Sequence, residues 1–332
     1  MEYRFLGRTG LKVSALGYGT WVTFGDQIGQ EQAEACLKAA YEAGINLFDT
    51  AESYARGRAE TMLGTALRKF GWKRSDLVVS TKLFWGGDGP NDTGLSRKHI
   101  LEGVDASLRR LGLEAVDLLF CHRPDRHTPI EETVRALSHV IDQGKAHYWG
   151  TSEWSALEIR TAWDIARLER LIPPSMEQPQ YNMFTRERVE REYAPLYREI
   201  GLGTTVWSPL ASGFLSGKYL EGVPQGSRFA LRGYGWLKKR FTGPGASAKI
   251  AKVRRLVRLA RELDLTLPRL ALAWCLRNPH VSSVLTGASR PEQVAENATA
   301  LEAVPRLTPE ALEKIEAILD NAPAPETDHR TA

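Results

Sequence analysis

Short apolar runs alternate with segments of helical periodicity along most of the chain. Each run is rich in β-branched or apolar residues and ends in polar ones, which is typical of strands buried in a parallel sheet. The predicted strands cover residues 13–19, 45–50, 77–82, 116–122, 146–152, 175–181, 203–209 and 281–287. The pattern therefore predicts eight strand–helix units.

The segments between these strands have the spacing of amphipathic helices. Thr128 and Ser155 each stand three residues before a glutamate, which predicts a capping box at two helix starts. Gly44 and Gly112 follow periodic segments and suit helix ends. The chain thus marks several helix boundaries as well as the helices themselves.

Eight repeated units need parallel strands with right-handed crossovers, and they close most naturally into a (β/α)8 barrel, the TIM-barrel fold. Residues 3–14 predict a β-hairpin that plugs the bottom of the barrel. About 70 residues separate the seventh and eighth strands, which is far more than one helix needs. The second half of this insertion predicts helices at 249–263 and 268–277, and Thr308 begins a last helix. We expect one domain over residues 1–320 and a disordered tail at 321–332.

Composition excludes several classes of protein. The 332 residues include 44 Lys and Arg against 40 Asp and Glu, a net charge of +4, with 42% hydrophobic residues. A chain of this kind can bury a full core, and no apolar run approaches the ~18 residues of a membrane span. The densest basic region, residues 238–261, lacks interleaved aromatic residues and a nucleic-acid motif. We expect neither a nucleic-acid partner nor membrane insertion.

The N-terminus lacks the basic and apolar regions of a secretory signal. Cys36, Cys121 and Cys275 are too far apart for a CxxC motif, so buried thiols in a reducing cytoplasm are the simplest interpretation. A metal site at His122 with His127 or Cys121 is disfavoured because no further ligand follows at a suitable spacing. We expect a cytoplasmic protein without a metal.

Polar residues close three neighbouring predicted strands. Asp49 ends the second, Lys82 the third and His122 the fourth, and Tyr54 follows five residues after Asp49. In barrels of this type the active site lies where the strands end. Each residue alone has an ordinary structural explanation, as a helix cap, a half-buried aromatic residue, a rim charge or a polar core group. Their joint placement favours a catalytic set.

Proton donation to oxygen is the chemistry that these side chains suggest. Tyrosine has a pKa of about 10, and a nearby ammonium such as that of Lys82 would lower the pKa of Tyr54. Asp49 would keep Lys82 charged and oriented. His122 would donate a hydrogen bond to a substrate carbonyl oxygen or help to shuttle the proton.

Several motifs resemble the aldo-keto reductase superfamily. They are FDTAESY at 48–54, STK at 80–82, CHRPD at 121–125, GTS at 150–152, WSPL at 207–210 and LTGAS at 285–289. The resemblance extends from Tyr3 to about Leu319. Gln178 and the strings at 207–211, 216–219 and 273–278 are similar to the branch that contains voltage-gated potassium channel β subunits and their plant and bacterial relatives.

This resemblance implies an NADPH-dependent oxidoreductase that reduces aldehydes and ketones to alcohols. Tyr54 would be the general acid, with Asp49, Lys82 and His122 completing a tetrad. Animal channel β subunits have Asn where this chain has His122, whereas the plant and bacterial relatives keep His. The complete tetrad favours catalysis over a purely regulatory role.

The resemblance also implies a set of cofactor contacts. Trp207 would stack on the nicotinamide, Ser152 and Gln178 would bind its carboxamide, and Ser289 with Arg290 would bind the 2′-phosphate at a helix N-terminus. The other implied contacts are Thr20, Trp21, Gln27, Asp49, Ser208, Leu210, Lys218, Arg228, Gly287, Gln293, Glu296 and Asn297. No GxGxxG fingerprint follows any strand, so the cofactor prediction depends on the barrel resemblance. Ser289 would alternatively cap this helix with Glu292.

Aromatic residues near the strand ends predict the wall of a substrate pocket for small or aromatic carbonyl compounds. They are Trp21, Phe24, Tyr54, Trp85 and Trp154. A rival hypothesis is an NADPH-binding, redox-sensing regulatory subunit with negligible turnover, because the insertion with Lys218 and Arg228 would slow cofactor exchange. A Schiff-base aldolase is disfavoured because Asp49 would keep Lys82 charged. The family branch contains tetramers, so we expect a homo-oligomer.

Overall fold

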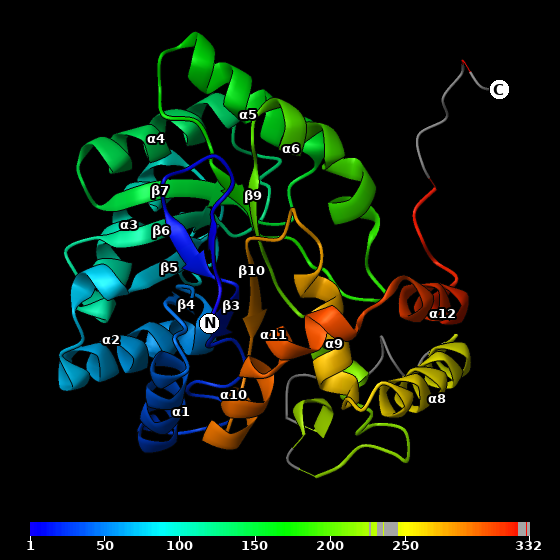
Figure 1. Cartoon of the computed structure of the whole chain (residues 1–332). Helices are drawn as coiled ribbons and strands as arrows, with labels where there is room; N and C mark the ends of the chain where they lie inside the picture. Colours follow the sequence, from blue (N-terminus) through cyan, green and yellow to red (C-terminus); the bar gives the residue numbers. More distant parts are fainter. Residues whose placement is uncertain (226, 231–234, 236–244, 325–329, 331–332) are drawn as a thin grey trace.

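The computed structural model describes residues 1–225, 227–230, 235, 245–324 and 330, without the side chain of Arg228. Parallel strands form a closed barrel in the order β10-β3-β4-β5-β6-β7-β8-β9, with helices around it (Figure 1). The strands are β3 (Leu16–Gly19), β4 (Leu47–Asp49), β5 (Val78–Leu83), β6 (Val116–Cys121), β7 (Ala146–Thr151), β8 (Met176–Glu177), β9 (Gly203–Val206) and β10 (Ser283–Thr286). The predicted (β/α)8 barrel is confirmed.

The first predicted strand is divided between two elements. Its beginning is β2 (Lys12–Ser14), which pairs antiparallel with β1 (Tyr3–Phe5), and its end is the barrel strand β3. This hairpin confirms the predicted plug, because Leu6 and Val13 pack on inward-facing side chains of the barrel strands. Gly7 has φ +56°, and a Cβ there would lie 2.3 Å from the carbonyl oxygen of Gly201, so the close approach requires glycine.

Helices follow the strands as the periodicity predicts. They are α1 (Gln30–Glu42), α2 (Arg58–Phe70), α3 (Arg97–Leu111), α4 (Ile130–Asp142), α5 (Ala156–Leu168), α6 (Ala194–Glu199), α8 (Ala246–Glu262), α9 (Leu267–Leu276), α10 (Pro291–Ala298), α11 (Ala300–Ala303) and α12 (Pro309–Leu319). Short helical turns cover Tyr54–Gly57, Arg74–Asp76, Arg188–Glu192, Ala211–Ser216, Arg228–Ala230 and Val304–Arg306. The long insertion lies between β9 and β10 and contains α8 and α9, as predicted.

The helix boundaries agree with the sequence in part. Ser155 forms the predicted capping box at the start of α5, and Gly112 is the left-handed C-cap of α3. The capping box predicted at Thr128 is wrong. Pro129 occupies the N-cap of α4, and the hydroxyl of Thr128 instead donates to Oδ2 of Asp125 at 2.7 Å.

The core fills the layer between the strands and the surrounding helices. Its members include the three cysteines, which are free and buried: Cys36 in α1, Cys121 in β6 and Cys275 in α9. In the insertion, α8 lies beside α12 at the edge of the barrel (Figure 1), where the ammonium of Lys252 donates to the carbonyl of Leu319. The basic residues at 238–240 and the tail positions 325–329, 331 and 332 lie outside the described residues.

Candidate active site

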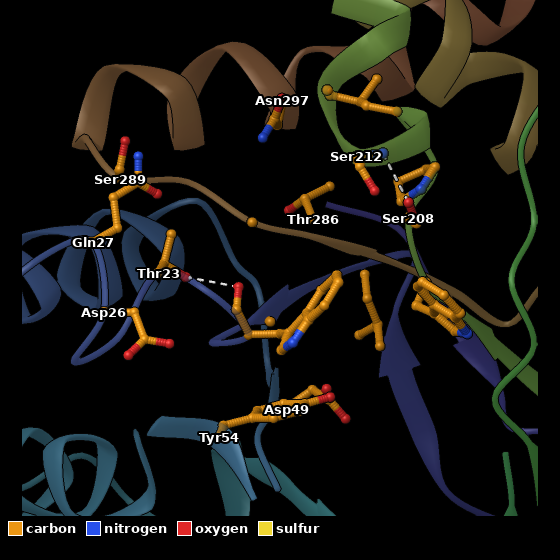
Figure 2. A pocket seen from close by; sticks show the side chains of 18 of the residues that line it. Thr23, Asp26, Gln27, Asp49, Tyr54, Ser208, Ser212, Thr286, Ser289 and Asn297 are labelled. Carbon is orange, nitrogen blue, oxygen red and sulfur yellow. Dashed lines mark hydrogen bonds between the residues drawn. The ribbon is translucent and has the colours of Figure 1, made fainter. Parts of the chain in front are cut away.

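A cavity of about 530 Å³ opens where the barrel strands end. Residues that close β3, β4, β6, β7, β9 and β10 line it, together with residues 208–218 of the insertion and residues of α10. Figure 2 shows Asp49 and Tyr54 on one side of this cavity and Ser208, Ser212 and Asn297 on the other. We call the first side, formed by Asp49, Tyr54, His122 and the buried Lys82, the floor. The second side, formed by residues 208–218 and 287–297, is the cover.

An ion pair between Lys82 and Asp49 is part of the floor. Lys82 is fully buried, and its Nζ lies 2.5 Å from Oδ2 of Asp49 and 2.7 Å from the carbonyl oxygen of Thr50. The other carboxylate oxygen of Asp49 accepts hydrogen bonds from Ser80 at 2.6 Å and from Gln178 at 3.0 Å. Because β4 and β5 pair with Asp49 beside Ser80, the barrel register itself brings this carboxylate to the strand ends.

Tyr54 begins the turn after β4, and its ring stands over the ammonium of Lys82, 4.8 Å from ring centroid to Nζ. Burial raises the pKa of Tyr54 well above its usual value, the carboxylate of Asp49 adds to the rise, and Arg123 opposes it. The predicted lowering of this pKa is therefore wrong. Lys82 faces the ring rather than the hydroxyl, and Asp49 neutralises its charge at short range.

His122 is neutral in this environment. Burial holds the pKa of its imidazole well below the usual value, and the charges of Lys82 and Arg123 lower it further. Its ring centroid lies 5.6 Å from that of Tyr54 and 5.1 Å from that of Trp85. Nδ1 of His122 is buried and has no hydrogen-bond partner in the part of the chain that the structure describes. The residue as a whole lines the cavity, so the imidazole ring lies beside Tyr54 where a bound molecule would meet both side chains.

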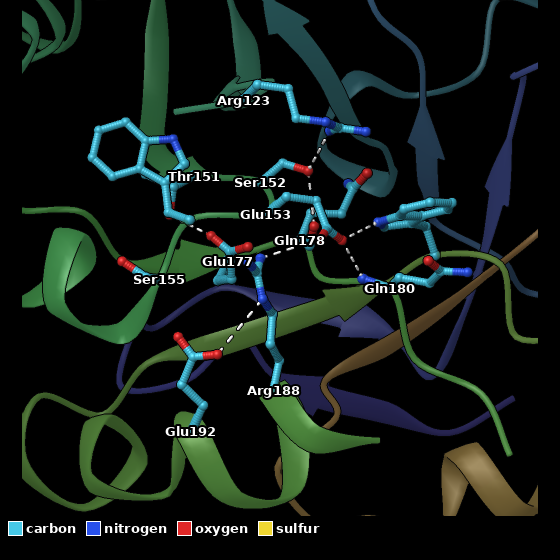
Figure 3. Close-up of polar contacts among 12 residues, drawn as sticks. Arg123, Thr151, Ser152, Glu153, Ser155, Glu177, Gln178, Gln180, Arg188 and Glu192 are labelled. Atoms are coloured by element: carbon cyan, nitrogen blue, oxygen red, sulfur yellow. Dashed lines mark hydrogen bonds and ion pairs between the residues drawn. The ribbon is translucent and has the colours of Figure 1, made fainter. Parts of the chain in front are cut away.

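Trp207 lines the cavity and is held by Glu153, a residue that Figure 3 labels. The indole Nε1 donates to Oε1 of Glu153 at 3.0 Å, and the same oxygen accepts the backbone N–H of Gln180 at 2.6 Å. The other oxygen of Glu153 pairs with Nη1 of Arg188 at 3.1 Å. Trp21 meets Trp207 edge to face, with ring centroids 6.1 Å apart. The indole is therefore fixed at its edge while its face lies at the cavity.

A second buried carboxylate lies behind the same wall. Glu177 ends β8 next to Gln178 and accepts hydrogen bonds from the hydroxyls of Thr151 and Tyr193, the latter at 3.4 Å. Burial raises the pKa of Glu177 to about 8, and the bond from Thr151 opposes the rise. The side chain is therefore mainly protonated at neutral pH.

The cover is made of tight turns and a helix start. Ser208, Ala211 and Ser212 have φ values of +57°, +48° and +58°, and the backbone N–H of Ser212 donates to Oγ of Ser208 at 2.9 Å. On the α10 side, Oε1 of Gln293 accepts the backbone N–H of Ser289 at 2.9 Å. The alternative cap formed by Ser289 with Glu292 is wrong, since Arg290 is the N-cap and makes no side-chain capping bond.

Most of the predicted site residues lie together at this cavity. Those that line it are Trp21, Gln27, Asp49, Tyr54, Trp85, His122, Ser152, Gln178, Trp207, Ser208, Leu210, Lys218, Gly287, Ser289, Gln293, Glu296 and Asn297. Lys82 lies beneath them, in contact with Asp49. The structure thus brings all four members of the predicted tetrad together.

Four predicted residues lie away from the cavity surface. Thr20 is fully buried and donates to Oγ1 of Thr50 at 3.0 Å. Phe24 and Trp154 are buried in the core and are not part of the pocket wall, contrary to prediction. Arg290 is exposed at the start of α10 and does not line the cavity either. The side chain of Arg228 lies outside the described residues.

Sequence reasoning missed several residues that line the cavity, including Arg123, Thr23, Asp26, Ser212 and Pro268. It also missed Glu153, which holds Trp207. Arg123 directly follows His122 and Glu153 directly follows Ser152. The signal for both residues is therefore their position directly after a polar residue that ends a strand.

Comparison with known proteins defines the class. Residues 15–320 match the family model of the aldo/keto reductases, and the chain therefore belongs to the aldo/keto reductase family. It is 55% identical over 324 residues to a protein of Oryza sativa subsp. japonica named "Probable voltage-gated potassium channel subunit beta", covering 97% of this chain and 98% of the relative. A protein of the same name from Arabidopsis thaliana is 54% identical, with the same coverage.

The described residues contain neither a membrane-spanning helix nor a metal-binding cluster. Among them, no helix has the length and apolar character needed to cross a membrane. No group of three or more His, Cys, Asp or Glu side chains in the described ranges is arranged to hold a metal ion.

Proposed function

We propose that this protein is an NADPH-dependent oxidoreductase that reduces aldehydes and ketones to alcohols. The observation that carries the proposal is the meeting of Tyr54 and His122 at the cavity floor, above the buried pair of Lys82 and Asp49. Membership of the aldo/keto reductase family supports this reaction class. The family match over residues 15–320 also supports a single domain ending at about residue 320.

The cavity has the chemistry that a reduced nicotinamide dinucleotide needs. An indole, an amide and a hydroxyl line it at Trp207, Gln178 and Ser152, close to the imidazole of His122. NADPH would supply the hydride. The residues that would hold it are Trp21, Gln27, Ser152, Gln178, Trp207, Ser208, Leu210, Lys218, Gly287, Ser289, Gln293, Glu296 and Asn297.

The proton comes from Tyr54. Its raised pKa keeps the phenol protonated at neutral pH, so the hydroxyl can donate to the oxygen of a bound carbonyl compound. Neutral His122 donates a second hydrogen bond to the same oxygen and fixes its position. The ammonium of Lys82 lies beneath the ring and positions it, and the charge of Arg123 favours the phenolate that forms as Tyr54 loses its proton. Asp49 keeps that ammonium charged and in place.

Replacement of Tyr54 by Phe tests the proposal. The variant keeps the ring over Lys82 and loses the acidic proton, so we expect turnover to fall by roughly 10² to 10⁴. NADPH absorbance would be followed with a panel of small and aromatic carbonyl compounds, and NADPH binding would be measured by quenching of protein fluorescence. Wild-type turnover by a variant that binds NADPH normally would show that Tyr54 is not the general acid.

A second candidate is a regulatory subunit that binds NADPH and turns over negligibly. The names of the relatives from rice and Arabidopsis favour it, and such a role would include a homo-oligomer or a channel partner in the cytoplasm. The cover residues 208–218 close over one side of the cavity, which would slow cofactor exchange. The measurement is the number of NADPH molecules that each subunit oxidises, with NADH tested alongside. Multiple turnovers favour the reductase, whereas oxidation of one NADPH per subunit favours the regulatory subunit.

A further inference from the structure

Arg123 places a positive charge on the same side of the cavity as His122. It directly follows His122 at the end of β6 and lines the cavity. Its guanidinium carbon lies 5.6 Å from the ring centroid of Trp85, which in turn lies 5.1 Å from the ring of His122. Nη1 donates to the carbonyl of His122. It also donates to Oγ of Ser152 at 3.3 Å (Figure 3).

The charge of this guanidinium is not balanced by a protein carboxylate. Lys82 has Asp49 at 2.5 Å and Arg188 has Glu153 at 3.1 Å, but no carboxylate in the described part of the chain lies within 4.0 Å of the Arg123 nitrogens. Both hydrogen bonds of Arg123 use Nη1. A half-buried guanidinium of this kind gains most from an anion that reaches it inside the cavity.

The position of Arg123 separates it from the predicted cofactor phosphate contacts. Those contacts, Lys218 and Ser289, belong to the cover, whereas Arg123 lies beside His122 and Trp85 on the substrate side. We propose that Arg123 binds a carboxylate of the substrate, so that the preferred substrates are aldehydes or ketones that also carry a carboxylate group. This inference rests on the proposed reductase function and adds the substrate class to it.

A matched pair of aromatic aldehydes tests the inference. 4-Carboxybenzaldehyde and methyl 4-formylbenzoate have the same ring and differ in charge. The ester withdraws electrons more strongly than the ionised carboxylate, so intrinsic carbonyl reactivity favours the ester and a preference for the acid must come from binding. We expect kcat/KM of the wild-type protein to be at least about tenfold higher for the acid. The KM for the acid, and not that for the ester, rises as salt screens the guanidinium. A ratio of one or less would overturn the inference.

Variants of Arg123 identify the group responsible. Arg123→Met lowers the acid-to-ester ratio of kcat/KM by at least about tenfold, and Arg123→Lys keeps part of it because the charge remains. The ratio removes any general effect of Arg123 on the electrostatics of Tyr54 and His122. Arg126→Met, an exposed residue of the same loop that does not line the cavity, changes net charge equally and leaves the ratio within about twofold. An unchanged ratio in Arg123→Met contradicts the proposal.

A binding measurement keeps the two proposals separable. Calorimetry would compare 4-(hydroxymethyl)benzoate with its methyl ester on wild-type and Arg123→Met protein loaded with NADP⁺. Acid-selective binding that depends on Arg123 supports the carboxylate site even if neither aldehyde is reduced, in which case only the reductase proposal fails. Reduction of both aldehydes without acid-selective binding overturns the carboxylate site and leaves the reductase proposal standing.

Discussion

The floor and the cover of the cavity face each other but are built in different ways. The floor consists of side chains at the ends of neighbouring barrel strands, and Lys82 and Gln178 both donate to the carboxylate of Asp49. The cover consists of turns with left-handed residues such as Ser208 and Ser212, which bond within their own segment. The barrel thus fixes the groups of the proposed chemistry, whereas the insertion and α10 shape the surface for a bound cofactor.

Left-handed residues occur on both sides of the cavity. Non-glycine residues with positive φ cost of order 1 kcal/mol each, and they cluster at Ser208, Ala211 and Ser212 in the cover and at Ala55 and Arg56 after Tyr54. The floor residues Asp49, Lys82 and His122 come from regular strands or their ends. Variants of the floor should therefore change stability as well as turnover, and variants of the cover should change cofactor binding alone.

The largest effect is expected at Lys82. Lys82→Met leaves the Asp49 carboxylate buried without its partner, which should lower the free energy of unfolding by about 3–5 kcal/mol and abolish turnover. The double variant Lys82→Met with Asp49→Asn should recover most of the stability and none of the turnover. Urea denaturation measures both variants. Equal stability of the single variant and the wild type would contradict a floor held by this ion pair.

A pH effect on stability is expected from Glu177. The folded protein holds its proton up to a pKa of about 8, whereas the unfolded chain releases it near the usual value. The folded state therefore binds more protons between these values, and the free energy of unfolding falls as pH rises through this window, by an order of 3–5 kcal/mol. Glu177→Gln should lack this fall. Urea denaturation at several pH values checks it, and parallel curves for both proteins would show that Glu177 ionises normally.

Glu153 contacts both Trp207 and Arg188, so its replacement tests what holds the indole of Trp207 in place. Glu153→Ala removes the acceptor of the indole N–H and leaves Arg188 without one carboxylate, so we expect KM for NADPH to rise about tenfold. Glu153→Gln keeps an acceptor and should have a smaller effect. Glu192→Gln is the matched control, because Glu192 also pairs with Arg188 but does not contact Trp207. An effect of the control equal to that of Glu153→Ala would assign the change to Arg188.

The smallest effect is expected in the cover. Ser289→Ala removes a hydroxyl that donates to Gln293 at 3.3 Å and lines the proposed 2′-phosphate end. KM for NADPH should rise about threefold, with KM for NADH and the free energy of unfolding unchanged within about 0.5 kcal/mol. Steady-state kinetics with both cofactors checks this. An equal rise for NADH would place the contact elsewhere than the 2′-phosphate.

The sequence was sufficient to predict the barrel and the four floor residues. Parallel strands end on the same face whatever their exact bounds, so Asp49, Lys82 and His122 had to lie close together once the strands were recognised. The hairpin plug followed from the turn-forming residues Arg8, Thr9 and Gly10 at the centre of residues 3–14. The division of the first run into β2 and β3 was not visible, because residues 13–19 are apolar or small throughout.

The direction of individual loop side chains was not predictable. Trp154 follows Glu153, which has φ +61°, and Phe24 lies two residues after Val22, which has φ +68°. These left-handed residues are not glycine, so nothing in the sequence marks where the chain reverses and turns both aromatic rings into the core. The raised pKa of Tyr54 was equally hidden, because its largest cause is burial, which the sequence does not show.

The three buried cysteines give the molecule internal reporters of its own opening. Burial raises the pKa of each thiol, so none reacts readily while its surroundings stay closed. Cys121 belongs to β6 next to the floor, Cys275 to the helix α9 of the insertion, and Cys36 to α1. The rate at which a thiol reagent labels each cysteine therefore measures how readily that region unfolds locally, and no probe has to be introduced.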